Sequence, residues 1–161
     1  MTEKFFAEVL GTMILILLGD GVVAGVLLAK TKANMTTGVG NSNGWIVITM
    51  AWAFAVFAGI AVAGQFSGAH INPAVSLAVF LGAAVNNAGD FGVDSLLVYW
   101  AGQFVGAMIG AFLVFLHYYP HWAETEDKGL KLAVFCTAPA IRNPLWNLVS
   151  EIIGTFALVF V

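Results

Sequence analysis

A short run in the middle of the chain combines glycine, histidine, asparagine and proline: Ser67-Gly68-Ala69-His70-Ile71-Asn72-Pro73-Ala74-Val75. It lies between two long apolar segments. Asn is a favoured N-cap, and Pro is favoured at the first helical position because its missing N–H is not needed there. Backbone polar groups are hard to satisfy in lipid, so such a loop must line a cavity or be buried in protein. The run predicts a loop that enters the membrane, turns at Asn72 and leaves as a short half-helix.

Two acidic residues in the same local context, Glu8 and Glu151, lie inside long apolar segments, where a charged group needs an explanation. An ionisable group inside a membrane span is costly and usually marks a function. One interpretation is a proton-relay site. The other is structural, with each carboxylate accepting hydrogen bonds from a nearby loop.

Few other side chains could carry chemistry. His70 could be a ligand, a titrating switch or a hydrogen-bonded loop residue, but no second His, Cys or carboxylate lies at ligand spacing, so we expect no metal. Cys136 is the only cysteine, which excludes an intrachain disulfide. No nucleophile–base pair is evident, so we expect neither an enzyme nor a bound cofactor.

The composition places the chain in a membrane. It has 161 residues, of which 60% are hydrophobic and 9% charged, and its mean hydropathy is +0.92. No soluble domain needs so little charge. The net charge of −3 is too small to indicate a nucleic-acid partner. We therefore expect an integral membrane protein in contact with the lipid bilayer.

Four apolar segments reach or approach the 20 or so residues that a spanning helix needs. They are Phe5–Ala29, Trp45–Gly64, Ser95–Tyr119 and the segment from Leu145 to Val161. Between the second and the third, Val75–Ala84 is apolar but too short to span. This length fits a re-entrant half-helix that starts at Asn72.

Three polar segments connect these elements: Lys30–Gly44, Val85–Asp94 and Pro120–Pro144. The last carries several charges and is predicted to be a solvated loop. In the third span, glycines recur four apart at 102, 106 and 110, a pattern that lets helices approach closely. Packing within one chain and packing between subunits both remain open for this face.

The chain also contains a repeated pattern. Glu8-Val9-Leu10-Gly11-Thr12 opens the first span, and Glu151-Ile152-Ile153-Gly154-Thr155 opens the fourth, 143 positions later. An odd number of spans between the two copies implies inverted repeats, a plan used by membrane transport proteins. A second Asn-Pro-Ala loop would then belong near position 215. We interpret residues 1–144 as a first repeat with its following loop, and residues 145–161 as the start of a second.

Together, the extended Asn72-Pro73-Ala74 motif, the opening at Glu8 and its echo at Glu151 resemble the major intrinsic proteins, the family of aquaporins and glycerol facilitators. The resemblance implies an all-α integral membrane fold with six spans and two half-helices in two inverted repeats. It also implies a multi-pass protein of the cell membrane that assembles as a homotetramer with one pore per subunit. This chain would be a truncated version, with three spans, one re-entrant half-helix and part of a fourth span.

In a pore of this kind, extended backbone before Asn72 would turn the carbonyls of Gly68, Ala69 and His70 toward the channel. Asn72 would supply an amide donor at the midpoint. The N-terminus of the half-helix carries roughly half a positive charge, which repels cations and tolerates neutral molecules. The resemblance favours the structural role for Glu8 and Glu151, so we expect Glu8 to accept hydrogen bonds from N–H groups of residues 67–71.

Trp52, twenty positions before Asn72, is the residue most informative about substrate. By resemblance to glycerol facilitators it aligns with the tryptophan of the outer constriction, where an indole offers an apolar wall to a carbon backbone. Packing without a pore role remains open for Trp52. The resemblance implies a passive channel for glycerol, small polyols and water. The alternatives are a water-selective aquaporin and a non-conducting truncated fragment.

Overall fold

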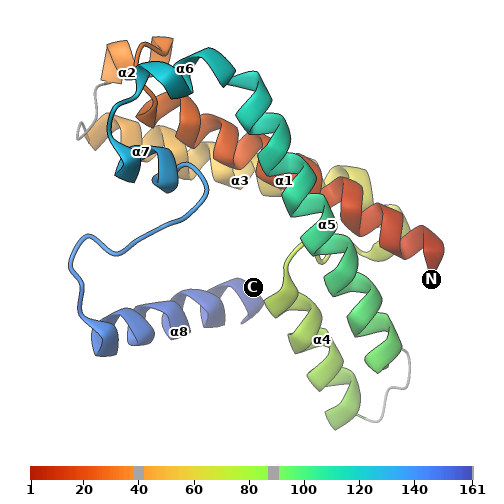
Figure 1. Ribbon diagram of the computed structural model, residues 1–161. Helices are drawn as coiled ribbons and strands as arrows, with labels where there is room; N and C mark the ends of the chain where they lie inside the picture. Colours follow the sequence, from red (N-terminus) through yellow and green to blue (C-terminus); the bar gives the residue numbers. More distant parts are fainter. Residues whose placement is uncertain (38–41, 87–90, 161) are drawn as a thin grey trace.

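The computed structural model describes residues 1–37, 42–86 and 91–160, with only the backbone described at 36–37 and 42–43. Every regular element in these ranges is an α-helix (Figure 1). The helices are α1 (Thr2–Leu27), α2 (Lys32–Thr37), α3 (Ser42–Ser67), α4 (Pro73–Val85), α5 (Val93–His117), α6 (Tyr119–Glu124), α7 (Lys128–Ala133) and α8 (Pro144–Phe160). Parts of two predicted connections, residues 38–41 and 87–90, and the last residue of the fourth span lie outside the described residues.

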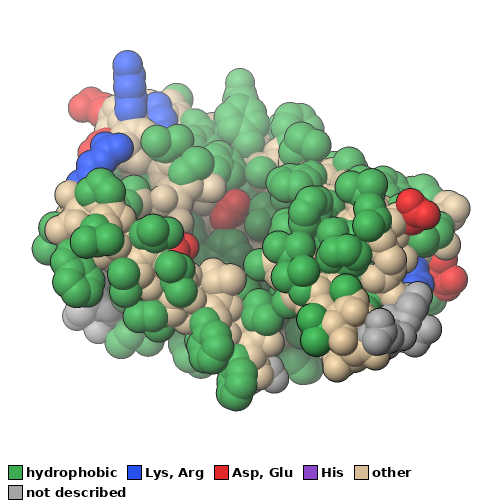
Figure 2. All heavy atoms as spheres, turned by 90° about the horizontal axis from the view of Figure 1, so that it is seen from below, with side chains coloured by type: hydrophobic (Ala, Val, Ile, Leu, Met, Phe, Trp, Pro, Cys, Tyr) green, Lys and Arg blue, Asp and Glu red, His purple; other side chains and the backbone are tan. Residues whose placement is uncertain are grey.

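Three of the helices, α1, α3 and α5, are long and apolar enough to cross a membrane. They correspond to the first three predicted spans, which are therefore confirmed. Hydrophobic side chains cover most of the face shown in Figure 2, and charged groups gather mainly at its two ends. The described residues form an all-helical bundle, as expected for a membrane chain, because a helix satisfies all its backbone polar groups within itself.

Glycine contacts hold α1 against its two long neighbours. A Cβ at Gly11 would lie 2.8 Å from Ala63 Cβ, and one at Gly59 would lie 2.9 Å from Gly11 O, so α1 and α3 touch backbone to backbone. On the other side, Gly102, Gly106 and Gly110 of α5 meet α1. The four-residue glycine spacing thus packs helices within one chain, the first of the two possibilities that the sequence leaves open.

The half-helix predicted after Asn72 is α4. It has 13 residues, or about 20 Å at 1.5 Å per residue, too short for a hydrocarbon core of about 30 Å. Asn72 is its N-cap, with Oδ1 accepting from Ala74 N at 2.8 Å, and Pro73 is its first residue. In Figure 1, α4 runs beside the first half of α5.

The charged segment Pro120–Pro144, which precedes α8, contains more helix than the predicted loop. It contains α6 and α7, and Val134, directly after α7, is 1% exposed against Ala24, Leu28 and Val114. The prediction of a solvated loop is wrong for this part, because local apolar residues cover the ends of α1 and α5. The charges themselves remain largely in solvent, as the exposed ion pair of Lys30 with Glu124 illustrates.

Helix α8 is the part of the fourth predicted span that the structure describes. It is a shorter apolar helix of 17 residues. Its only neighbour with several contacts is α4, and none of its residues is buried. In Figure 1 it lies apart from the α1–α3–α5 bundle.

Candidate functional site

The segment between α3 and α4 is a tight, non-extended loop. The φ angles are +81° at Gly68, +51° at Ala69 and +42° at Ile71. Left-handed φ is uncommon for alanine and is a clear outlier for a β-branched residue such as Ile71. The expectation of extended backbone here is wrong. The reason is visible in the hydrogen bonds of the loop, because this conformation aims successive N–H groups at one carboxylate.

That carboxylate belongs to Glu8, which is fully buried. It accepts four hydrogen bonds, from Ser67 Oγ at 2.6 Å, His70 N at 3.0 Å, Ile71 N at 2.7 Å and Gln103 Nε2 at 2.8 Å. The predicted bonds from the loop to Glu8 are therefore present. Charge-assisted bonds of this kind are the strong ones, and they offset the cost of the left-handed backbone.

Helix α5 clamps the loop from the other side. Tyr99 donates its hydroxyl to Ser67 O at 2.5 Å, and Trp100 donates its indole N–H to Pro73 O at 3.0 Å. The Tyr99 ring also lies 4.5 Å from the His70 ring, measured between centroids. The loop and the start of α4 are thus held by side chains from both α1 and α5.

His70 is tied to the half-helix through Ser76. His70 Nδ1 lies 3.0 Å from Ser76 Oγ, and Gln103 Nε2 donates to the same oxygen at 2.9 Å. Ser76 is 0% exposed and Gln103 is 2% exposed. No group of three or more His, Cys, Asp or Glu that could hold a metal occurs among the described residues.

The loop leaves a row of acceptors and one donor without partners. No described residue donates a hydrogen bond to the carbonyl oxygens of Gly68, Ala69 or His70. Because Asn72 uses Oδ1 to cap α4, its Nδ2 is directed away from the helix N-terminus, and it bonds to no described residue. The segment 68–74, which the sequence predicts to be functional, therefore offers three carbonyl acceptors and one amide donor to a solute.

Trp52 lies on α3, the helix that leads into the loop. Its ring packs flat against Gly19 of α1, where a Cβ would come within 2.7 Å of three ring carbons. The side chain is half-buried and also packs against the cluster that contains Ala69 and Ile71. The loop and Trp52 thus share one apolar cluster.

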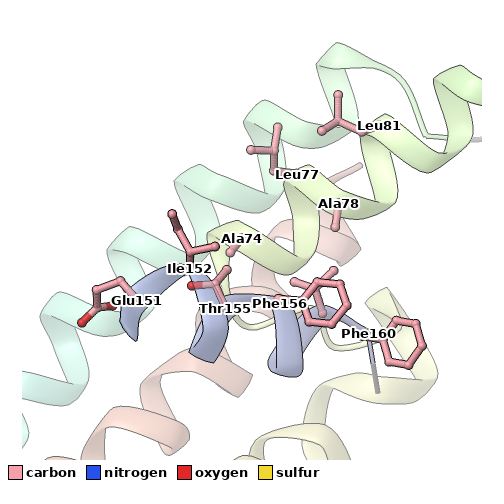
Figure 3. A pocket seen from close by; sticks show the side chains of 10 residues that line it. Ala74, Leu77, Ala78, Leu81, Glu151, Ile152, Thr155, Phe156 and Phe160 are labelled. Carbon is pink, nitrogen blue, oxygen red and sulfur yellow. The ribbon is translucent and has the colours of Figure 1, made fainter. Parts of the chain in front are cut away.

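Glu151 has none of the partners of Glu8. It is exposed and lines an apolar groove between α4 and α8. Figure 3 shows Ile152 and Thr155 of α8 beside Ala74 of the Asn-Pro-Ala motif, whereas the carboxylate of Glu151, at one end of the groove, points away from Ala74. The supporting role of Glu151 stays a prediction.

Sequence reasoning missed three supports of the loop: Ser76, Tyr99 and Gln103. A polar side chain inside an apolar span was the available signal for Gln103, and the same signal applied to Ser76 within the half-helix. Asp20, a further acidic side chain within the apolar α1, is 8% exposed. Burial of this kind depends on the packing of neighbouring helices, so the spacing along one helix does not reveal it.

With this geometry in view, comparison with known families becomes informative. The family model "Major intrinsic protein" matches residues 1–161. The chain belongs to the major intrinsic protein family. The all-helical bundle, the half-helix capped by Asn72 and the loop bound to Glu8 are thus features of a major intrinsic protein.

This major intrinsic protein is similar in sequence to several bacterial glycerol uptake facilitator proteins. It is 50% identical over 157 residues to glycerol uptake facilitator protein 3 of Lactiplantibacillus plantarum, covering 98% of this chain and 60% of the relative. It is 50% identical over 159 residues to the glycerol uptake facilitator protein of Streptococcus pneumoniae, covering 99% and 62%. A probable glycerol uptake facilitator protein of Thermotoga maritima is 49% identical over 154 residues, covering 96% and 60%. The chain thus spans about three fifths of the length of these relatives.

Proposed function

We propose that this chain builds one wall of a passive channel for glycerol and other small neutral solutes, with water also passing. One observation carries the proposal. The carbonyls of Gly68, Ala69 and His70 and the Nδ2 of Asn72 bond to no described residue. In contrast, the backbone N–H groups of residues 68–71 are all bound, by Gly64 O, Ser67 Oγ and the Glu8 carboxylate. Acceptors followed by a donor can replace the hydration shell of a hydroxyl or a water molecule.

The capped start of α4 supports selectivity against charge. A helix N-terminus carries roughly half a positive charge. Placed beside the Asn72 amide, this partial charge repels cations and tolerates neutral molecules. A passive channel needs such fixed dipoles and no reactive group.

The choice of glycerol and small polyols rests on two supports. The named relatives are glycerol uptake facilitators. Trp52 presents an indole in the same apolar cluster as the loop. A polyol needs an apolar wall for its carbons as well as polar groups for its hydroxyls, whereas water needs only the latter. We therefore assign Trp52 to the outer constriction.

The test is glycerol flux through the full-length protein in liposomes, measured by stopped-flow reswelling. We expect glycerol to enter liposomes that carry the protein far faster than it enters empty liposomes. An impermeant osmolyte, also uncharged, serves as the reference that gives no reswelling. A rate equal to that of empty liposomes would overturn the proposal.

A water-selective aquaporin is the alternative, and Trp52→His separates the two. Imidazole would replace the apolar wall by a polar ring that hydrogen-bonds water. Glycerol flux should then fall several-fold more than water flux in paired swelling assays. Equal losses would assign Trp52 to folding alone, and no change in either flux would place it outside the pore. Trp45→His, at an exposed position on the same helix, is the matched control.

Assembly and location follow from the same proposal. We assign residues 1–144 to a first repeat and residues 145–161 to the start of a second, with a homotetramer as the assembled form and the cell membrane as its location. The exposed apolar residues of α3, such as Phe54 and Phe57, are then available to lipid or to a neighbouring subunit. Crosslinking of the full-length protein in native membranes tests the assembly state.

The 161-residue chain by itself supplies one half-helix and one wall. We therefore expect it not to conduct glycerol when reconstituted alone. Reswelling of liposomes that carry only this chain would contradict this expectation. It would mean that copies of the chain pair to rebuild the missing wall.

A further inference from the structure

Ser76 lies at the centre of a small buried network that the channel proposal leaves unexplained. Its hydroxyl oxygen is 3.0 Å from His70 Nδ1, 2.9 Å from Gln103 Nε2 and 3.4 Å from Asn72 O. The residue itself is 0% exposed. A hydroxyl has one proton to donate and two lone pairs to accept with, so the roles of these contacts can be assigned.

Gln103 determines the first role. Its Nε2 donates to Glu8 Oε2 at 2.8 Å and to Ser76 Oγ at 2.9 Å, which uses both amide protons. The opposite orientation of the amide would place its carbonyl oxygen against the Glu8 carboxylate, two acceptors facing each other. Ser76 Oγ therefore accepts from Gln103, and its own proton is left to donate.

The Ser76 proton has two possible acceptors, His70 Nδ1 and Asn72 O. The Asn72 carbonyl already accepts from Ser76 N at 3.1 Å, and its distance to Oγ is the longer of the two. His70 Nδ1, at 3.0 Å, lies well inside the usual range for a hydrogen bond. The hydroxyl therefore donates to Nδ1, which must be unprotonated.

We propose that Gln103 and Ser76 are positioning residues that hold neutral His70 in the tautomer with its proton on Nε2. This inference deepens the proposed channel function and rests on it for its purpose. Neither Nε2 nor the backbone carbonyl of His70 bonds to a described residue, so His70 offers an N–H donor as well as a carbonyl acceptor. One residue then presents both a donor and an acceptor, which matches the two faces of a solute hydroxyl.

Two aromatic rings keep the imidazole in place for this role. The centroid of the His70 ring lies 4.5 Å from that of Tyr99 and 5.2 Å from that of Phe91. Both partners are tilted against the imidazole, at 47° and 38°. The ring plane is thus held by packing, and the hydrogen bond to Ser76 chooses which nitrogen carries the proton.

The experiment is solid-state ¹⁵N NMR of the full-length protein in liposomes, labelled at histidine. Protonated and unprotonated ring nitrogens give well-separated signals, and a His70→Gln spectrum assigns the signals of this residue. At a pH where His70 is neutral, we expect an unprotonated Nδ1 and a protonated Nε2. A protonated Nδ1 in the wild-type protein would overturn the proposal directly, without any variant.

Variants then test the roles of the two positioning residues. Ser76→Ala should convert His70 to a mixture of tautomers, and Ser76→Thr should restore the wild-type signals because it keeps the hydroxyl. Gln103→Met should also give a mixture, since the Ser76 hydroxyl is then free to turn its proton toward Asn72 O and to accept from Nδ1–H. Ser95→Ala removes a buried hydroxyl elsewhere on α5 and should leave His70 unchanged. An unaltered tautomer of His70 in both Ser76→Ala and Gln103→Met would overturn the positioning role of these two residues.

Glycerol swelling of the same preparations separates this inference from the channel proposal. The tautomer is read from the spectrum whether or not the protein conducts. If the protein conducts glycerol but His70 carries its proton on Nδ1, only the positioning proposal is refuted. A non-conducting protein with the expected tautomer would refute only the channel.

Discussion

Glu8 and Glu151 open the same five-residue pattern, yet they differ in burial and in hydrogen bonding. Glu8 is fully buried and accepts four hydrogen bonds, three of them from residues 67–71. Glu151 is exposed on a helix with no buried residue. Gly11 is in contact with α3, whereas a Cβ at Gly154 would meet nothing within 4 Å. The five-residue pattern therefore does not bury its glutamate by itself; at Glu8, the loop of residues 67–71 supplies three of the hydrogen-bond donors.

The largest effect that this comparison predicts is on Glu8→Gln. The new amide places a donor among four existing donors, so at least one buried bond is lost and another becomes repulsive. We expect the free energy of unfolding in detergent to fall by about 3 kcal/mol. Glu151→Gln in the same 161-residue chain should change it by less than about 0.5 kcal/mol. Equal losses from the two substitutions would contradict the difference drawn between the two sites.

Gly11→Ala and Gly154→Ala sharpen the comparison through packing alone. The methyl at Gly11 would lie 2.8 Å from Ala63 Cβ and Ile71 Cγ2, whereas the one at Gly154 has open space. We expect a loss of about 2 kcal/mol at Gly11 from overpacking. Substitution at Gly154 should be neutral or slightly stabilising, because alanine favours a helix. Denaturant titration of both variants, read by far-UV circular dichroism, measures the difference, and a neutral Gly11→Ala would refute the close contact.

Tyr99→Phe tests whether the conformation of the loop at residues 67–71 depends on α5 as well as on Glu8. The change removes only the hydroxyl that donates to Ser67 O at 2.5 Å and leaves a buried carbonyl unpaired. We expect a loss of about 1 kcal/mol and faster hydrogen exchange at His70 N and Ile71 N. Tyr119→Phe, at a residue that is 62% exposed, is the control and should be silent. Unchanged exchange in Tyr99→Phe would mean that Glu8 alone holds the loop.

The smallest expected effect concerns a third carboxylate, Glu124, which is paired but exposed. The hydrogen bond and the charge of Lys30 lower the pKa of Glu124 below its usual 4.5. A lowered folded-state pKa means that the pair stabilises the protein above the usual pKa. This stabilisation is lost as the pH falls through the folded-state pKa.

Lys30→Gln should therefore lower the melting temperature slightly at neutral pH and not at all once Glu124 is protonated. The measurement is the difference between wild-type and variant melting temperatures across the acid range. High salt should reduce this difference at neutral pH, since exposed pairs are screened. A difference that is independent of pH would assign the effect to something other than the ion pair.

Much of this architecture could be predicted from sequence because its causes are local. Long apolar runs gave the three spans, and the Asn-Pro start followed by a short apolar run gave α4. The hydrogen bonds from the loop to Glu8 were predicted, but the left-handed φ values of Ala69 and Ile71 were not. Those angles arise from hydrogen bonds to a residue about sixty positions away, which no local propensity encodes.

By itself, the sequence determined that the chain is a membrane protein with three spans, a half-helix capped by Asn72 and an unusual carboxylate at position 8. Hydrophobic length and capping preference act between near neighbours, so they can be read from the order of residues. Only the tertiary structure decided that Gln103 and Ser76 complete the Glu8 network, that the α5 glycines face α1 and that Val134 is buried. Each of these depends on which helix faces meet, and in an almost uniformly apolar chain the hydrophobic pattern does not distinguish one face from another.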